Sequence, residues 1–193
     1  KAVDLYQVAL AYDEQQIAPD SAVIKDLHRL LDLRDFADFN QQIAQLSLDG
    51  YALPLDFGVD VDMKDTKHHV LSTSSPSTIL PDTTQYGTPE GDQLLAIYRK
   101  QSIALLELAM IAEPEATALV DAALAFDQKI SKIVKSNEEW ADYPASYNPY
   151  DFADFAAKFK SLDVTAFVQA VFGEVPAKVI EADPKFLDHA EEL

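Results

Sequence analysis

The sequence predicts a mainly α-helical, multi-helical domain with antiparallel helix pairs and one small β-hairpin. Only 5 of its 193 residues are glycine, fewer than a loop-rich or all-β protein of this length needs. Hydrophobic residues make up 48% of the chain and recur mostly at helical spacing, so the chain can bury a sizeable core. We therefore expect residues 1–193 to form a single helical lobe.

Three helices are predicted in the first fifty residues. The first covers residues 3–12, with Leu5, Val8, Ala9 and Tyr12 on one face. The second is capped by Asp20 or Ser21 and runs to about Leu33. Its buried face is formed by Val23, Ile24, Leu27, Leu30 and Leu31. Asp35 opens the third helix and Gly50 ends it, with apolar side chains at intervals of three and four at Phe36, Phe39, Ile43 and Leu46.

A β-hairpin is predicted over about residues 55–72, because apolar and polar residues alternate between Leu55 and Val61. A polar turn at residues 63–66 leads to a return strand that begins near His68. An isolated hairpin is only marginally stable, so it must pack on the helices or on chain outside this sequence. Residues 72–91 are predicted to form a long loop, and loops of this length are usually functional or in contact with a partner.

Two long helices are predicted next, and the short link between them favours an antiparallel pair. The first covers about residues 92–111 and has an apolar stripe of Leu94, Tyr98, Leu105, Leu108 and Ala109. The second starts at Pro114 and buries Leu119, Val120, Ala123, Leu124, Ile130, Ile133 and Val134. Shorter helices are predicted at residues 152–159, from the cap Asp163 to Gly173, and from Asp183 and Pro184 onward.

Both ends of the sequence lie inside helical patterns. No capping residue precedes Val3, and the helix that Asp183 begins is still amphipathic at Ala190. Domain boundaries usually fall in polar linkers instead. We therefore expect this sequence to be part of a larger protein.

The charge of the chain excludes two classes of partner. Acidic residues outnumber basic ones by 33 to 15, which gives a net charge of −18. This charge would repel the phosphates of nucleic acid and an anionic membrane surface. The chain has no cysteine, no apolar run near the ~20 residues that span a bilayer, and no recognisable leader. These features predict a cytoplasmic location.

The histidines do not predict a metal site. His28 and Asp32 share one helical face, but two ligands are too few for zinc and a surface charge pair explains them better. His68 and His69 are consecutive on a strand and therefore point to opposite faces. His189 lacks the second histidine of an H-E-x-x-H motif.

The acidic clusters and the candidate nucleophiles do not predict a metal site or a catalytic site either. Asp60, Asp62 and Asp65 are spaced somewhat like a calcium loop, but Lys64 stands where a ligand belongs and no glycine follows it. There is no cysteine, no G-x-S-x-G or S-x-x-K motif, and no glycine-rich phosphate loop. The Glu138–Glu139 pair carries no signal in so acidic a chain, and Trp140 is expected to anchor the core or a loop. We assign no catalytic, cofactor-binding or metal-binding residue.

Five segments, in their order and spacing, resemble the N-terminal region of the neprilysin family of zinc metallopeptidases, especially the bacterial oligopeptidase O type. The segments are residues 53–86, 94–111, 118–142, 146–159 and 176–193. The first is similar to the family's hairpin with an aspartate- and lysine-containing turn, followed by a loop that ends in Leu80-Pro81-Asp82. The last resembles a strand-like link followed by a helix. The loop departs from the family at Gln85-Tyr86, where two adjacent tyrosines are common.

The resemblance implies a two-lobed full-length enzyme whose zinc is held by H-E-x-x-H and a downstream glutamate in the C-terminal half. This chain would be the non-catalytic lid lobe, which restricts the access of oligopeptide substrates to an enclosed cavity. Its partners would be its own C-terminal catalytic domain and the substrate, with zinc in the full-length enzyme and no cofactor in this segment. We expect exposed apolar surface where the other half docks.

Two alternatives remain open at the level of the sequence. The chain could be a stand-alone acidic helical domain with a binding or scaffold role and no enzymatic activity. It could instead be a metal-dependent enzyme that uses His28, His68 or His69.

Overall fold

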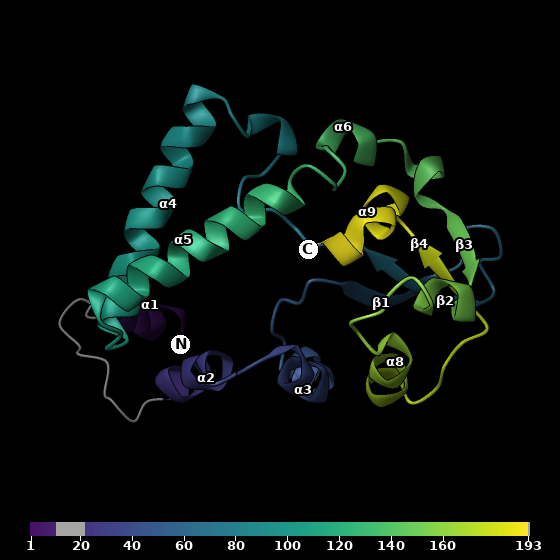
Figure 1. Ribbon diagram of the computed structural model, residues 1–193, viewed down its shortest axis with the longest axis horizontal. Helices are drawn as coiled ribbons and strands as arrows, with labels where there is room; N and C mark the ends of the chain where they lie inside the picture. The colour runs from purple at the N-terminus through teal and green to yellow at the C-terminus, as the bar shows by residue number, and fades with distance from the viewer. Residues whose placement is uncertain (11–21, 193) are drawn as a thin grey trace.

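The computed structural model describes residues 1–10 and 22–192 (Figure 1). Its helices are α1 (Ala2–Leu10), α2 (Ala22–Leu31), α3 (Phe36–Leu48), α4 (Pro89–Leu108), α5 (Glu113–Ile130), α6 (Asn137–Trp140), α7 (Phe152–Ala156), α8 (Val164–Phe172) and α9 (Pro184–His189). Short 3-10 helices are η2 (Thr83–Gln85), η3 (Tyr143–Ser146) and η4 (Ala190–Glu192). The strands are β1 (Asp56–Val61), β2 (His69–Ser74), β3 (Asn148–Asp151) and β4 (Lys178–Glu181). The mainly α-helical fold class is confirmed.

The predicted hairpin is present, but it is half of a four-stranded sheet with the order β1-β2-β4-β3. β1 and β2 are antiparallel, β4 joins β2 in parallel, and β3 pairs antiparallel with β4 at the edge. The expectation of a lone hairpin is therefore corrected, because β3 lies in a stretch that carries no strand periodicity. Pro149 fits there because an edge strand can leave one side of its backbone unpaired.

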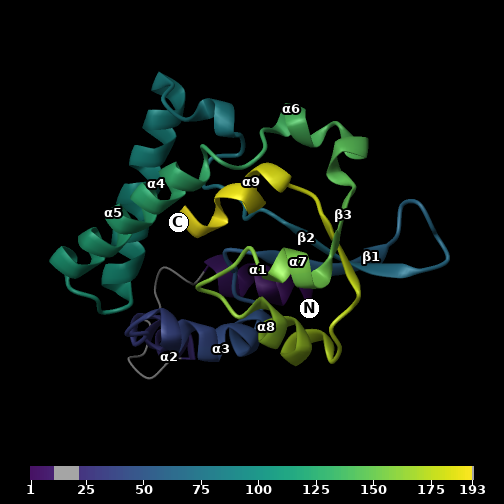
Figure 2. The same cartoon turned by 45° about the vertical axis from the view of Figure 1, so that its right-hand side comes forward.

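The core lies where the sheet meets the surrounding helices (Figure 1). In this view α9 lies above the sheet and α8 below it. Figure 2 shows the β1–β2 turn projecting away from the helices. The buried cluster contains Ile43, Leu55, Leu71, Ile130, Val134, Phe152, Phe155, Leu162, Val164, Phe167, Val168, Val179, Phe186 and Leu187. One apolar core therefore joins segments from residue 43 to residue 187.

Several predicted helix starts are confirmed by their caps. The side chains of Asp35, Asp163 and Asp183 each accept a hydrogen bond from a main-chain N–H in the first turn of α3, α8 and α9. α8 also ends as predicted, with Gly173 at a φ of 82°. The predicted helix end at Tyr12, the predicted caps Asp20 and Ser21, the side chains of Val8, Ala9 and Val23, and Leu193 lie outside the described residues.

Three other helix boundaries differ from the prediction. α4 begins at Pro89 rather than near residue 92, because the Thr88 hydroxyl accepts from the Gly91 N–H and caps the helix earlier. α5 ends at Ile130, and the turn after it places Val134 in the core and packs the partly buried Ile133 against it. α7 stops at Ala156 instead of 159. No helix within residues 1–10 and 22–192 is both long and apolar enough to cross a membrane.

α4 and α5 pack against each other as the predicted pair and turn at residues 109–112 (Figure 1). The apolar stripe predicted for α4 faces outward rather than into this pair. Leu94, Tyr98, Leu105 and Leu108 are exposed, with Leu105 at 65%, and only Ala109 is buried. On α5, Val120 and Ile130 are buried as predicted, whereas Ala123 is exposed.

Candidate functional site

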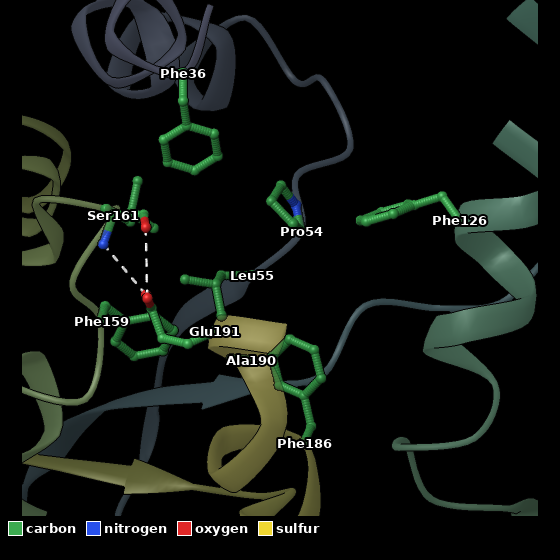
Figure 3. Close-up of a pocket in the computed structure, with 10 residues that line it drawn as sticks. Phe36, Pro54, Leu55, Phe126, Phe159, Ser161, Phe186, Ala190 and Glu191 are labelled. Atoms are coloured by element: carbon green, nitrogen blue, oxygen red, sulfur yellow. Dashed lines mark hydrogen bonds between the residues drawn. The ribbon is translucent and has the colours of Figure 1, made fainter. Parts of the chain in front are cut away.

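A pocket lined mainly by apolar side chains, four of them phenylalanines, lies between α3, α5 and the C-terminal helices, and we call it the aromatic pocket (Figure 3). Its volume is about 330 Å³. Phe36 of α3 and Phe126 of α5 point into the same space, with Pro54 between them. The remaining walls are formed by Leu55, Phe159, Ser161, Leu162, Phe186, Ala190 and Glu191. The pocket is therefore a site for apolar groups rather than for charged ones.

Among the described residues, Glu191 is the only carboxylate that lines this pocket, and it already accepts hydrogen bonds from the neighbouring backbone. Its Oε1 accepts from the Lys160 N–H at 2.7 Å and from the Ser161 N–H at 3.2 Å. The Ser161 hydroxyl donates weakly to Oε2 at 3.4 Å. None of the described residues that line the pocket is a histidine, so the lining offers Ser161 no imidazole base that would make it a nucleophile. Glu191 positions the loop before α8.

All four histidines are exposed in the structure, and only His68 and His69 are neighbours. His28 and Asp32 share only a main-chain hydrogen bond, from the Asp32 N–H to the His28 carbonyl. His68 Nδ1 lies 2.7 Å from Asp65, and His189 Nδ1 lies 3.0 Å from Glu192. Zinc needs three or four protein ligands. The described part of the chain brings no three His, Asp or Glu side chains together in a metal-binding arrangement, so it does not fit a zinc ion.

The aspartates of the hairpin build its turn. The Asp62 carboxylate accepts from the Lys64 main-chain N–H at 2.8 Å and from the Tyr147 hydroxyl at 2.9 Å. These two bonds hold the pKa of the Asp62 carboxyl below its ordinary value. The Lys64 ammonium also lies 4.3 Å from the centre of the Tyr147 ring. The cluster ties the turn to the segment before β3.

The long loop between β2 and α4 is pinned to α5 by a buried carboxylate. Asp127 accepts from the Ile79 N–H at 2.8 Å and from the Tyr86 hydroxyl, which in turn accepts from the Leu80 N–H at 3.2 Å. Burial and then the Asp127 hydrogen bond raise the pKa of Tyr86 to about 12, so this hydroxyl stays protonated. The predicted loop is therefore an ordered connection.

The Leu80-Pro81-Asp82 string forms the next anchor of this loop. Leu80 is buried. Asp82 accepts from the Thr84 N–H at 2.7 Å and from the Asn137 N–H at the start of α6 at 2.9 Å. A Cβ atom on Gly91 would lie 2.0 Å from the Gln85 carbonyl oxygen, so the first turn of α4 can pack this closely only on glycine. The string fixes the loop and does not form a reactive group.

The acidic pair and tryptophan considered from the sequence also have structural contacts. Glu139 completes a capping box with Ser136 at the start of α6. Glu138 is exposed. The Lys135 ammonium lies 4.8 Å from the centre of the Trp140 ring. Trp140 therefore anchors the turn after α5.

Sequence reasoning missed both the aromatic pocket and a buried pair of acids at the end of β4. Glu181 and Asp183 are almost completely buried in the structure. Glu181 directly follows the apolar pair Val179–Ile180, and Asp183 was predicted only as a helix start, so the sequence marks neither acid as buried. The pocket residues are distributed from residue 36 to residue 191, so no local pattern gathers them.

Comparison with known proteins matches the whole chain to one protein family. The family model described as Peptidase family M13 matches residues 1–193. The neutral endopeptidase of Lactobacillus helveticus is 49% identical over 193 residues, which are 100% of this chain and 30% of that protein. The neutral endopeptidase of Lactococcus lactis subsp. cremoris is 32% identical over 196 residues, covering 100% of this chain and 31% of that protein. The chain thus spans about 30% of the length of these curated relatives.

Solved structures agree with this match. The crystal structure of PEPO from Lactobacillus rhamnosis HN001 superposes with a TM-score of 0.81 at 29% identity, covering 92% of this chain and 28% of that one. The Mycobacterium tuberculosis zinc metalloprotease Zmp1 in complex with inhibitor gives a TM-score of 0.77 at 20% identity, covering 88% and 27%. The second likeness concerns the fold alone.

Proposed function

The chain belongs to peptidase family M13, and from this premise we propose that it forms the non-catalytic lid region of a zinc metalloendopeptidase for short oligopeptides. The enzyme would act in the cytoplasm. Zinc and the residues that activate water would be supplied by the C-terminal catalytic domain. The family match confirms that this chain is an N-terminal region of a neprilysin-like peptidase.

One observation carries the proposal. The match to the family extends over all 193 residues, yet the described residues gather no metal-binding cluster. A lobe without reactive groups can still contribute to catalysis by enclosing the substrate, excluding water and limiting the size of what enters. A stand-alone scaffold role is not favoured, because the relatives carry this region within a chain about three times as long.

The exposed apolar residues support docking of this lobe against further protein. α4 carries exposed Leu94, Ile97, Tyr98, Leu105 and Leu108, and Met110 follows at its end. Exposed apolar side chains in this number indicate an interface with another part of the protein. The net charge of −18 would favour the entry of basic or neutral peptides over acidic ones.

We expect the full-length enzyme to discriminate strongly by substrate size. One cleavage sequence is placed in a ladder of quenched fluorescent peptides of increasing length and in an exposed loop of a folded protein. Because an enclosing lobe excludes bulky substrates, kcat/KM should fall by about tenfold or more between the short peptides and the folded protein, which is about 1.4 kcal/mol of transition-state stabilisation. A control protease with an open cleft should cleave both kinds of substrate. Equal kcat/KM values for the short peptides and the folded protein in the M13 enzyme would contradict a lid role.

A further inference from the structure

Two carboxyl groups are buried where β4 leads into α9. Glu181, the last residue of β4, is 1% exposed, and Asp183 is 0% exposed. In the sheet register, Glu181 is paired with Thr73 of β2 and with Asn148 of β3. Burying two acids this close together is costly unless hydrogen bonds or positive charge compensate each one.

The two carboxyls have different hydrogen-bond partners. Asp183 accepts from the Phe186 N–H at 3.2 Å through Oδ1 and from the Lys135 N–H at 3.0 Å through Oδ2. Among the described residues, the Glu181 carboxyl accepts only from the Asp183 N–H, at 2.6 Å. Main-chain donors on both oxygens suit a charged carboxylate, whereas a single donor compensates burial only in part. The two carboxyls therefore lie in different environments, because Asp183 has a main-chain donor on each oxygen and Glu181 has one donor in all among the described residues.

The Lys135 ammonium, whose positive charge acts on Glu181, donates its hydrogen bonds to other groups. The Lys135 ammonium donates to the Ala182 carbonyl at 2.6 Å and to the Ser146 hydroxyl at 3.2 Å. None of the ion pairs formed by the described residues includes Glu181 or Lys135. Burial therefore outweighs the Lys135 charge and raises the pKa of Glu181 to about 8.

A second observation points to the same carboxyl. The Thr73 side chain is 2% exposed, and its Oγ1 has no hydrogen-bond partner among the described residues. Paired residues of parallel strands direct their side chains to the same face of a sheet, so Thr73 and Glu181 share a face. A neutral carboxyl brings an O–H donor to this face, and a carboxylate brings none.

We propose that Glu181 is a proton-controlled latch that holds the β4–α9 junction against β2 and the end of α5 while its carboxyl is neutral, and loosens the junction when it ionises. A new charge there would lie beside the Asp183 carboxyl, without an ion-pair partner. Thr73 and Asn148 pair with Glu181 in the sheet, the Asp183 N–H donates to it, and the Lys135 charge acts on it. Around these groups, Ser146 accepts from the Lys135 ammonium, Lys185 donates to the Val134 carbonyl, and Glu139 interacts with both lysines.

The pH window follows from the direction of the shift. The folded pKa of Glu181 is raised to about 8 from the ordinary value of 4.5, so the closed form holds a proton that the open form loses. The closed form is therefore weakened progressively as pH rises from about 4.5 to about 8. Within this window each pH unit changes the ratio of closed to open forms by up to about tenfold.

Hydrogen exchange of the β4–α9 segment, read by mass spectrometry and corrected for the intrinsic pH dependence of exchange, tests the latch. In the wild-type protein the opening equilibrium of this segment should rise by about tenfold or more from the acidic to the alkaline end of the window. Glu181→Gln removes the titrating proton, so its opening equilibrium should not change with pH and should match the wild type at the acidic end. The matched control Glu174→Gln changes an exposed glutamate in the loop before β4 and should behave like the wild type.

Two results would overturn the latch. One is the same pH dependence in Glu181→Gln as in the wild type. The other comes from ¹³C-carboxyl NMR of the glutamate-labelled wild-type protein, which does not depend on whether the variant folds. In this spectrum we expect one glutamate to titrate near pH 8. Titration of every glutamate near the ordinary value of 4.5 would rule out a neutral Glu181.

Discussion

Replacing Phe155 by alanine is expected to lower the free energy of unfolding by about 3–5 kcal/mol, the usual cost of truncating a fully buried phenylalanine. The Phe155 side chain is 0% exposed. Its ring meets that of Phe57 edge-on at 6.1 Å and lies 5.3 Å from that of Phe159. It therefore joins α7 to β1 and to the wall of the aromatic pocket. The loss would be a large fraction of the stability of a single domain.

Urea unfolding followed by circular dichroism measures this effect. Phe126→Ala is the matched control, since it truncates the same side chain at a 40% exposed position on α5. We expect the control to cost about 1 kcal/mol or less, because surface substitutions remove few contacts. Similar losses for the two variants would show that the core is not organised around Phe155.

Replacing Asp127 by alanine is expected to cost about 3 kcal/mol and to free the loop between β2 and α4. The change leaves the Ile79 N–H and the Tyr86 hydroxyl without their acceptor in a partly buried place. Unmade hydrogen bonds to a buried charged group each cost about 1–3 kcal/mol. Tyr86→Phe removes one of the two donors and should cost less.

Urea unfolding together with hydrogen exchange at Ile79 and Leu80 reads both parts of this prediction. Because Asp127 and Tyr86 act in one network, the double variant should lose less than the sum of the two single losses. Asp121→Ala is the control, because Asp121 pairs with Arg99 on the exposed face of α4 and α5 and should contribute at most about 1 kcal/mol. Unchanged exchange at Ile79 in Asp127→Ala would show that the loop is held by other contacts.

Local signals predicted most of the helices but not the complete sheet. Asp35, Asp163 and Asp183 cap their helices as expected, because a cap depends on residues within one turn. β3 and its pairing with β4 depend on contacts about thirty residues apart, and the short β3 segment with Pro149 has no alternating pattern. The sequence showed the apolar stripe of α4, which the structure exposes. Periodicity alone does not tell whether such a stripe faces the core of the same lobe or another protein surface.

The candidate site was less accessible from sequence than the fold. The pocket gathers Phe36, Phe126 and Phe186 from three helices that are far apart in the sequence, so no local pattern connects these residues. The burial of Glu181 could not be predicted from the sequence either, because a carboxyl at the end of an apolar strand is ordinarily exposed. Here Asp183, which caps α9, turns the chain so that both acids lie inside. The assignment of no catalytic residue remains a prediction.

Hydrolysis of a quenched fluorescent peptide by the 193-residue chain in the presence of zinc tests the central claim most directly. Because the claim places the reactive groups in the C-terminal catalytic domain, the chain should give no turnover above the zinc-containing buffer, while the full-length protein cleaves the same peptide. Circular dichroism of the same sample confirms that the chain is folded. Zinc-dependent turnover by the 193-residue chain would contradict the claim that this lobe contributes access and enclosure rather than chemistry.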